Sequence, residues 1–293
     1  MDKFCCFYKV LKDKETEFAS LNIENVILDA IKLEEYLCEY LLLRENLAFV
    51  FCEPTTNQRN YQLMLKRFLP RERPTNIDKF VNTELDKNKA FYSFLAEAIL
   101  PLAYRDIYGY KLASAAIDIK QTLTDTSTGA DACMFDEKGI FVLGEAKFYK
   151  SLKLGLDEII ANFKEKRGFI NKLDNLNRNF SNNSQTNSLI IRQLGKDAAC
   201  EYEFHEFLKL PIYFSGFVLH ELGERKFEDF KSDIFYDSYD INVSSILANL
   251  KRNYPNIENG NFHISMFHFP INSKEKLISK MIAKCYELKK KGD

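Results

Sequence analysis

The sequence has little net charge and no long apolar run, and each absence excludes a class of function. Its 293 residues carry a formal net charge of −1, so the chain cannot hold nucleic acid by bulk electrostatics, because that affinity grows with the number of phosphates neutralised. Any nucleic-acid contact must be a local patch or be supplied by a partner. No stretch approaches the ~18 apolar residues of a membrane-spanning helix, and no apolar segment follows a basic start. We expect a cytoplasmic protein with no membrane contact.

Common metal, redox and nucleotide motifs are also missing. The seven cysteines are scattered without a CxxC pair, which favours buried reduced thiols over disulfides or a zinc site. His263 and His268 should lie on opposite faces of a strand, and His205 and His220 have no neighbouring ligand pattern, so all of them are expected to be structural. No Walker motif, GxGxxG or long-period repeat occurs, so any ATP-driven step belongs to another protein.

The composition is that of a globular protein with an α/β core. With 46% hydrophobic residues, the chain can form one large domain or a core with an appended lobe. We expect an N-terminal α+β lobe at residues 1–75 and a core at 76–293. The alternative is that both parts form one continuous domain. Hydrophobic periodicity predicts helices at residues 31–43, 88–108, 156–173 and 273–289, and strands at 47–52, 113–120, 211–219 and 262–269. An Asn- and Ser-rich loop is expected at residues 174–188.

The most informative stretch is a predicted β-hairpin whose strands end in charged residues. Asp131 opens an apolar run, a polar turn ending at Gly139 follows, and a second apolar run leads to Glu145 and Lys147. Side chains alternate along a strand, so Glu145 and Lys147 point to one face. If residues 137–139 form a three-residue loop with Gly139 in the left-handed conformation, Asp131 falls directly opposite Glu145. A two-residue loop would instead place the two carboxylates on opposite faces.

Carboxylates placed in this way need a cation. Directly opposed residues have β-carbons about 4.5–5.5 Å apart, and like charges there are destabilising unless positive charge lies between them. A divalent cation and Lys147 would both supply it. A further carboxylate, Glu97, is the only charge between Lys89 and Arg105 in an apolar helical segment, where an ionised group is costly without a cation or donor. Glu97 either reaches solvent at the helix edge or joins the site.

These residue types suit metal-dependent cleavage of a phosphodiester. That reaction needs a metal that polarises the phosphate and generates hydroxide, and a cation near the attacking water or the transition state. Hard oxygen ligands suit Mg²⁺ or Mn²⁺ and leave positions open for water and phosphate. In this interpretation Asp131, Glu145 and Glu97 bind the metal, helped by the carbonyl of Ala146, and Lys147 orients the nucleophilic water.

The ordered set of a helical Glu, an Asp at a strand entry and a Glu-x-Lys on the next strand resembles the PD-(D/E)xK nuclease superfamily. A closer resemblance is carried by Gly129-Ala130-Asp131 and by Leu143-Gly144-Glu145-Ala146-Lys147-Phe148-Tyr149, with a helix starting between Ser151 and Leu156. These motifs resemble the HamA family of Hachiman anti-phage defence systems, chiefly over residues 88–175.

The resemblance implies a nuclease-like core, with a mixed central sheet flanked by helices, and a bacterial DNA nuclease effector. It also implies a helicase partner, HamB, that keeps the nuclease inactive until it meets phage-associated or damaged DNA. Aromatic-rich segments at residues 204–217 and 227–239 are candidates for the helicase interface. A second interpretation is a non-catalytic regulatory or scaffold subunit of a helicase complex. The opposed carboxylates favour the nuclease, because a scaffold gains nothing from them.

Two groups of basic residues are candidates for phosphate contact, although each also fits a solvated face. They are Arg59, Lys66, Arg67, Arg71 and Arg73 in the first group, and Lys147, Lys150, Lys153, Lys164, Lys166 and Arg167 in the second.

Overall fold

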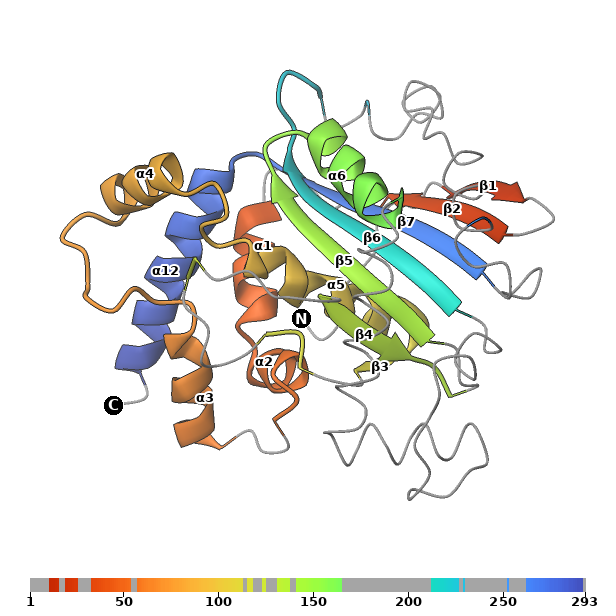
Figure 1. Ribbon diagram of the computed structural model, residues 1–293. Helices are drawn as coiled ribbons and strands as arrows, with labels where there is room; N and C mark the ends of the chain where they lie inside the picture. The colour runs from red at the N-terminus through yellow and green to blue at the C-terminus, as the bar shows by residue number, and fades with distance from the viewer. Residues whose placement is uncertain are drawn as a thin grey trace.

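The computed structural model describes residues 11–15, 19–25, 33–53, 57–112, 115–117, 123–124, 131–137, 141–164, 212–226, 229, 252 and 262–291. These residues form a mixed α/β fold around a seven-stranded sheet of order β1-β2-β7-β6-β5-β4-β3 (Figure 1). The strands are β1 (Leu11–Glu15), β2 (Ala19–Asn25), β3 (Lys111–Leu112), β4 (Ala132–Phe135), β5 (Phe141–Tyr149), β6 (Ile212–Glu221) and β7 (Phe262–Ile271). The helices are α1 (Leu33–Leu41), α2 (Arg44–Val50), α3 (Gln58–Lys66), α4 (Ile77–Lys87), α5 (Phe94–Tyr108), α6 (Leu152–Lys164) and α12 (Lys274–Lys290).

The sheet is parallel at its centre and antiparallel at both edges. Strands β5, β6, β7 and β2 pair in parallel with their neighbours. Strand β1 adds antiparallel to β2, and β4 and β3 add antiparallel beyond β5. Parallel strands covered on both faces have nearly continuous apolar sequences, as β6 does between Phe214 and Leu219. The expected mixed sheet is confirmed.

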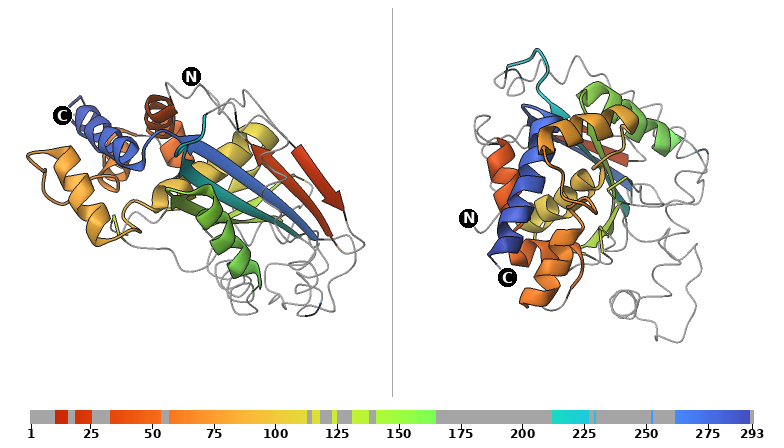
Figure 2. Two further views of the ribbon diagram at one scale, coloured as in Figure 1. Left: turned by 90° about the horizontal axis from the view of Figure 1, so that it is seen from above. Right: turned by 90° about the vertical axis from the view of Figure 1, so that its left-hand side faces the viewer.

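Helices cover both faces of the sheet at close range (Figure 2). Helix α5 packs on one face, where a Cβ added to Gly144 of β5 would lie 2.4 Å from Leu100 Cδ2. Helix α6 packs on the opposite face, where a Cβ added to Gly155 would lie 2.5 Å from Val218 Cγ1 of β6. A Cβ at either position would force the contacting side chain to move, so the two glycines let α5 pack close to β5 and α6 pack close to β6.

Elements from both ends of the chain share one hydrophobic core. Helix α12 lies against α1, α3 and α4 (Figures 1 and 2), and their buried side chains belong to the same cluster as those of α5 and the sheet. Strands β1 and β2 join the central sheet through β7. The expected division of the chain at residue 75 stays a prediction. No helix in the described part of the chain is both long and apolar enough to cross a membrane.

Local sequence explains where several helices begin and end. Asn57, Asn76 and Ser273 each precede a helix, and their side-chain oxygens accept a hydrogen bond from a backbone N–H in its first turn. Helix α5 ends at Gly109, whose φ of 73° is readily adopted only by glycine. Pro101 lies inside α5, which remains one helix.

Several predicted elements are confirmed, and others are wrong. Helix α1, strands β4 to β7 and helix α12 lie where the sequence predicts them. The predicted strand at residues 47–52 is wrong, because residues 44–50 form helix α2 with Leu47 and Val50 buried. A short apolar run cannot distinguish a strand from a buried helix by periodicity alone.

Two further boundaries differ from the prediction. The helix expected at residues 88–108 begins only at Phe94, after a series of turns. Strand β3 is Lys111–Leu112, just before the strand expected at 113–120, and within that range the described residues 115–117 form no strand. Residues 113–114, 118–120, 165–173 and the loop expected at 174–188 lie outside the described residues.

Candidate active site

Strands β4 and β5 pair in the register that the sequence predicts for a three-residue loop. Ala132 lies opposite Gly144 and Phe135 lies opposite Phe141, which brings Asp131 to the level of Glu145. The ladder ends there. The Asp131 N–H donates to the Gly144 carbonyl at 2.9 Å, and the Asp131 carboxylate accepts a hydrogen bond from the Ala146 N–H at 2.7 Å.

Within the described residues, no strand pairs with the edge of β5 beside these carboxylates. From Glu145 to Tyr149, β5 continues beyond the described residues of β4 while still pairing with β6. The N–H and C=O groups of one strand residue point to the same side. The Ala146 carbonyl therefore points to the open edge where its N–H meets Asp131. The Ala146 carbonyl is one of the metal ligands that the sequence predicts.

Glu145 and Lys147 form an ion pair on the face of β5 that α6 covers. The Lys147 Nζ lies 2.9 Å from Glu145 Oε1 and 3.6 Å from Glu158 Oε1 of α6. Burial by itself lowers the pKa of Lys147, but the carboxylates of Glu145 and Asp131 outweigh burial and raise it. Lys147 is therefore held as a cation between acidic groups.

Glu97 reaches the same place from the first turn of α5. Its side chain is 4% exposed, and its Oε2 has no hydrogen-bond partner in the described structure. Burial and then the neighbouring Asp131 raise the pKa of Glu97 well above its usual range, while Arg67 and Lys147 only partly oppose them. Glu97 thus does not reach solvent at the helix edge. It is a buried carboxylate for which the site offers too little positive charge.

The prediction that Arg67 is a candidate for phosphate contact is wrong, because Arg67 is buried. It is 3% exposed, and its guanidinium carbon lies 3.7 Å from the centroid of the Phe94 ring. A buried guanidinium stacked on an aromatic ring is not a surface contact for phosphate. Its charge acts inside the protein, where it favours the ionised form of Glu97.

A strained residue fixes the segment that leads into α5. Tyr92 has a φ of 66°, which is unusual for a residue with a side chain and is found at structurally demanding positions. Its N–H donates to the Leu123 carbonyl at 2.9 Å, and its hydroxyl donates to the Phe68 carbonyl at 2.5 Å. These bonds set the start of the helix and hence the position of Glu97.

The predicted side chains meet at one cavity of about 820 Å³. Glu97, Asp131, Glu145 and Lys147 all line it, together with the other β5 residues from Ala146 to Tyr149. Its other charged residues are Asp86, Lys89, Lys150, Glu158, Lys274 and Glu275. The cavity is large enough for a nucleotide-sized ligand, since small-molecule sites are typically about 300–1,000 Å³.

The donor set suits a divalent cation, although the side chains do not converge on one point. In the described part of the chain, no three His, Cys, Asp or Glu side chains are grouped so that they could hold a metal ion. Glu145 already forms an ion pair with Lys147, and one oxygen of Asp131 already accepts a hydrogen bond from the Ala146 N–H. The Glu97 oxygen that has no partner among the described residues and the Ala146 carbonyl are hard donors of the kind that Mg²⁺ prefers. The chemistry of these donors fits such an ion.

The sequence did not indicate two polar features of this region. Lys274, in the first turn of α12, lines the cavity, and nothing in the sequence distinguishes it from other lysines. His220 and His268 lie on neighbouring strands, with His220 Nε2 2.9 Å from His268 Nδ1. Both histidines are buried, and their pairing depends on the parallel register of β6 and β7.

Part of the predicted helicase interface is wrong. Phe214 and Phe217, within the segment 204–217, are 1% and 2% exposed and belong to the core. Residues 204–211 lie outside the described residues, as does the segment 227–239 apart from Asp229.

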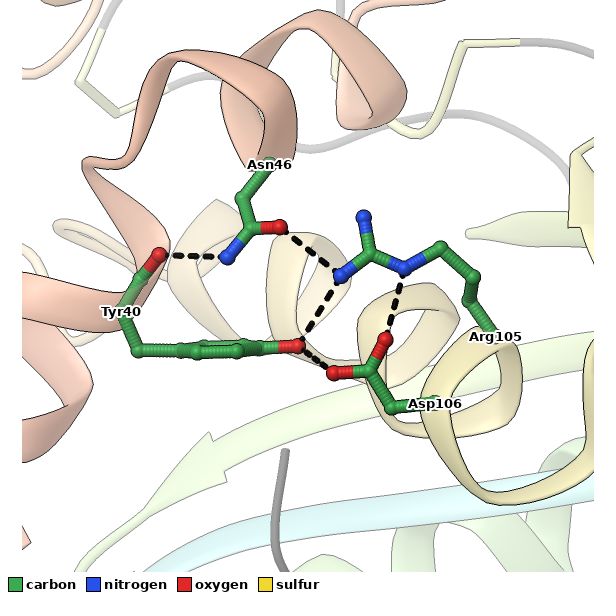
Figure 3. Close-up of polar contacts among 4 residues, drawn as sticks. All are labelled: Tyr40, Asn46, Arg105 and Asp106. Atoms are coloured by element: carbon green, nitrogen blue, oxygen red, sulfur yellow. Dashed lines mark hydrogen bonds and ion pairs between the residues drawn. The ribbon is translucent and has the colours of Figure 1, made fainter. Parts of the chain in front are cut away.

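A second polar cluster lies at the other end of α5 and involves α1 and α2 (Figure 3). Arg105 donates to Asp106 Oδ1 at 2.7 Å, to Asn46 Oδ1 at 2.8 Å and to the Tyr40 hydroxyl at 3.1 Å. The Tyr40 hydroxyl in turn donates to Asp106, and the Asn46 amide donates to the Tyr40 carbonyl at 2.6 Å. This network joins three helices and contains no cavity-lining residue.

The fold and the site together define an α/β protein with an acidic, lysine-containing cavity at an open sheet edge. The sequence model of the HamA family matches residues 4–285 of the chain, so the chain belongs to the HamA family. Membership of this family implies a component of a Hachiman anti-phage defence system that acts with a partner of that system. No curated protein matches the chain.

Proposed function

We propose that this chain is the metal-dependent DNA nuclease of its Hachiman system, with a PD-(D/E)xK nuclease-like core. The observation that carries the proposal is the cavity in which Asp131, Glu145 and Lys147 are joined by Glu97, a buried carboxylate with one oxygen that lacks a hydrogen-bond partner among the described residues. Such an arrangement is electrostatically unfavourable until a cation binds. A purely structural site would gain nothing from it.

Each residue has a role that follows from its position. Asp131, Glu145 and Glu97, with the Ala146 carbonyl, would hold Mg²⁺ or Mn²⁺. Bound there, such a cation polarises a phosphate oxygen and makes water a better nucleophile. Lys147 lies beside Glu145 and Glu158, from where its ammonium can orient a water molecule or stabilise charge on the phosphate. Its raised pKa keeps it charged at neutral pH.

Charge supports gating by a partner. A chain of net charge −1 has little non-specific affinity for DNA at physiological salt, because that affinity depends on counterion release. A helicase of the HamB type, tracking along DNA, would hold the substrate near the cavity at a high effective concentration. We infer that the chain is inactive alone and cleaves DNA when the helicase reaches a DNA end or a single-stranded region.

The test is cleavage of plasmid DNA by the chain alone and with its helicase, in Mg²⁺ and ATP. Mg²⁺ or Mn²⁺ should support cleavage, and Ca²⁺ should bind without supporting it, because Ca²⁺ takes more ligands in looser geometry and acidifies water poorly. Full activity in excess EDTA would rule out the metal. Equal activity of the isolated chain and the pair at physiological salt would rule out gating.

The alternative is a non-catalytic regulatory subunit. In that case the pair would show no cleavage with any metal, and a Lys147→Ala chain would support the helicase as well as the wild type does.

A further inference from the structure

Lys274 is a buried lysine whose ammonium group has no carboxylate partner in the described structure. It is 4% exposed. Its Nζ donates to the carbonyl oxygen of Phe148 at 2.9 Å and to that of Lys89 at 3.2 Å, and it lies 4.5 Å from the centroid of the Phe148 ring. Backbone carbonyls and a ring face are dipolar partners, so they solvate the ammonium but do not neutralise its charge.

The nearest acidic side chains are engaged elsewhere. Glu275 forms an ion pair with Lys150 at 2.5 Å, and Glu221 Oε1 accepts a hydrogen bond from the backbone N–H of Lys274 at 2.7 Å. Burial lowers the pKa of Lys274 to about 8, and Glu275 and Glu221 only partly oppose that shift. A buried cation with so little compensation is costly, and an anion that binds nearby would relieve the cost.

The ammonium lies on the edge of β5 that carries the candidate metal ligands. Carbonyls two residues apart in a strand point to the same side, so Phe148, which Lys274 contacts, presents its carbonyl on the same side as Ala146. Two residues of a strand span about 6.6 Å. Lys274 therefore lines the cavity a short distance along the strand from Asp131 and Glu145.

We propose that Lys274 binds a backbone phosphate of the nucleic acid strand, next to the phosphate that is cleaved at Asp131 and Glu145. The proposal rests on the proposed nuclease function and adds a substrate requirement to it. An ammonium has three N–H donors, and the Phe148 and Lys89 carbonyls use two of them. The third serves an anion in the cavity. The substrate is thus a strand that continues past the cleaved bond, and an isolated phosphodiester is a poor substitute.

Binding of a labelled oligonucleotide in Ca²⁺ tests this without requiring cleavage. Lys274→Gln removes the charge and keeps an N–H donor for the carbonyls, and Lys274→Arg keeps the charge. Lys276→Gln is the matched control, because Lys276 is exposed in the same turn of α12. Losing one phosphate contact should reduce the slope of log affinity against log salt by about 0.9 for a duplex or about 0.7 for a single strand. We expect this reduction in Lys274→Gln, and wild-type slopes in Lys274→Arg and Lys276→Gln.

A structural role for Lys274 would give a different result. Weaker binding of Lys274→Gln with an unchanged salt slope would overturn the proposal, as would the absence of DNA binding by the wild-type chain at low salt in Ca²⁺. Oligonucleotide cleavage by the helicase pair should show a raised KM in Lys274→Gln and a wild-type KM in Lys276→Gln. A reduced slope without cleavage in any metal would instead refute the nuclease function and leave phosphate binding intact.

Discussion

Helix α5 carries charged side chains at both ends, and the two ends are built in opposite ways. At its C-terminal end, the part-buried Arg105 and Asp106 form an ion pair at 2.7 Å, and Tyr40 and Asn46 add hydrogen bonds to it (Figure 3). At its N-terminal end, Glu97 faces Asp131 and Glu145 with one oxygen unpartnered in the described structure.

The difference separates a structural cluster from a functional one. Buried polar groups are normally fully hydrogen-bonded, because an unpaired one loses its hydration without compensation. The Arg105 network meets that rule, because none of its buried side-chain N or O atoms lacks a partner in the described structure, and it joins three helices. The Glu97 cavity breaks the rule within the same helix, although residues at both ends belong to one hydrophobic cluster. Functional sites are where such exceptions are expected.

Removing a charged side chain from the cavity should produce the largest effect of all the changes, and the effect should be on the rate of DNA cleavage. Lys147→Ala or Glu145→Ala should reduce DNA cleavage by the helicase pair by about 10³-fold or more, as loss of a group that stabilises the transition state does. The fold should persist in both variants. Glu145→Ala removes one of several like charges, whereas Lys147→Ala removes a counter-charge and should cost some stability without unfolding the chain. Initial cleavage rates and far-UV circular dichroism measure the two expectations. A Lys147→Ala chain that cleaves at the wild-type rate would end the catalytic assignment.

The same kind of change at the other end of α5 should act on stability. Asp106→Asn removes the partner of Arg105 and the acceptor of the Tyr40 hydroxyl, and breaking a buried pair from one side typically costs about 3–5 kcal/mol. Because Arg105 is 22% exposed, we expect the lower end, about 3 kcal/mol, in urea unfolding. Glu84→Gln is a control, since its ion pair with Lys87 lies on the surface of α4 and should contribute less than about 1 kcal/mol. Similar losses in both variants would contradict a structural role for the network.

The histidine pair sharpens the comparison, because it is buried and paired but uncharged. The His220 Nδ1–H donates to the Glu221 carbonyl, so His220 Nε2 accepts from the His268 Nδ1–H in the neutral state. Burial lowers the pKa of His220 to about 4 and lowers that of His268 well below its usual range. As pH falls below 6.5, the two histidines therefore bind protons in the unfolded state but stay neutral in the folded state.

Acid should consequently destabilise the fold. A folded-state pKa below the unfolded value means that the stability is complete above pH 6.5 and is lost as pH falls toward 4. Between pH 7.5 and 5.5 each histidine should cost about 1–1.5 kcal/mol of unfolding free energy. A variant with asparagine at both positions should lose less stability over this range. An equal loss in wild type and variant would place the acid sensitivity in other groups.

Local pattern predicted the part of the site that depends on one hairpin. The alternation of Asp131 to Lys147 left two registers open, and the one expected for a three-residue loop ending at Gly139 is the β4–β5 register of the structure. Elements whose identity depends on distant contacts were not predictable in this way. Residues 47–50 form a helix because α2 packs on α3 and α5, and Arg67 is buried because Phe94 lies over it. Lys274 contacts Phe148, a residue 126 positions earlier in the sequence, so no local pattern predicts this contact.

The smallest expected effect is on stability, in Glu97→Gln, which makes the same chemical change as Asp106→Asn on the same helix. The raised pKa of Glu97 shows that the folded state disfavours its charged form. A carboxyl group of this kind lowers stability as pH rises from its unfolded pKa toward its folded pKa, so the fold is weakened by Glu97 at neutral pH. Glutamine removes that penalty but also removes a countercharge of Arg67. We expect a net gain of about 1 kcal/mol in EDTA at pH 7.5.

A bound metal ion should make the wild type more stable than Glu97→Gln, which reverses the order expected in EDTA. A ligand that binds only the folded state stabilises it by about 2.7 kcal/mol at a concentration of 100 times its Kd. Mn²⁺ should therefore stabilise the wild type more than Glu97→Gln, in which the site has lost an oxygen donor of full charge. Urea unfolding of both chains, in EDTA and in Mn²⁺, gives all the free energies needed. If Glu97→Gln is the less stable chain already in EDTA, Glu97 is compensated in the way that Asp106 is, and the contrast between the two ends of α5 does not hold.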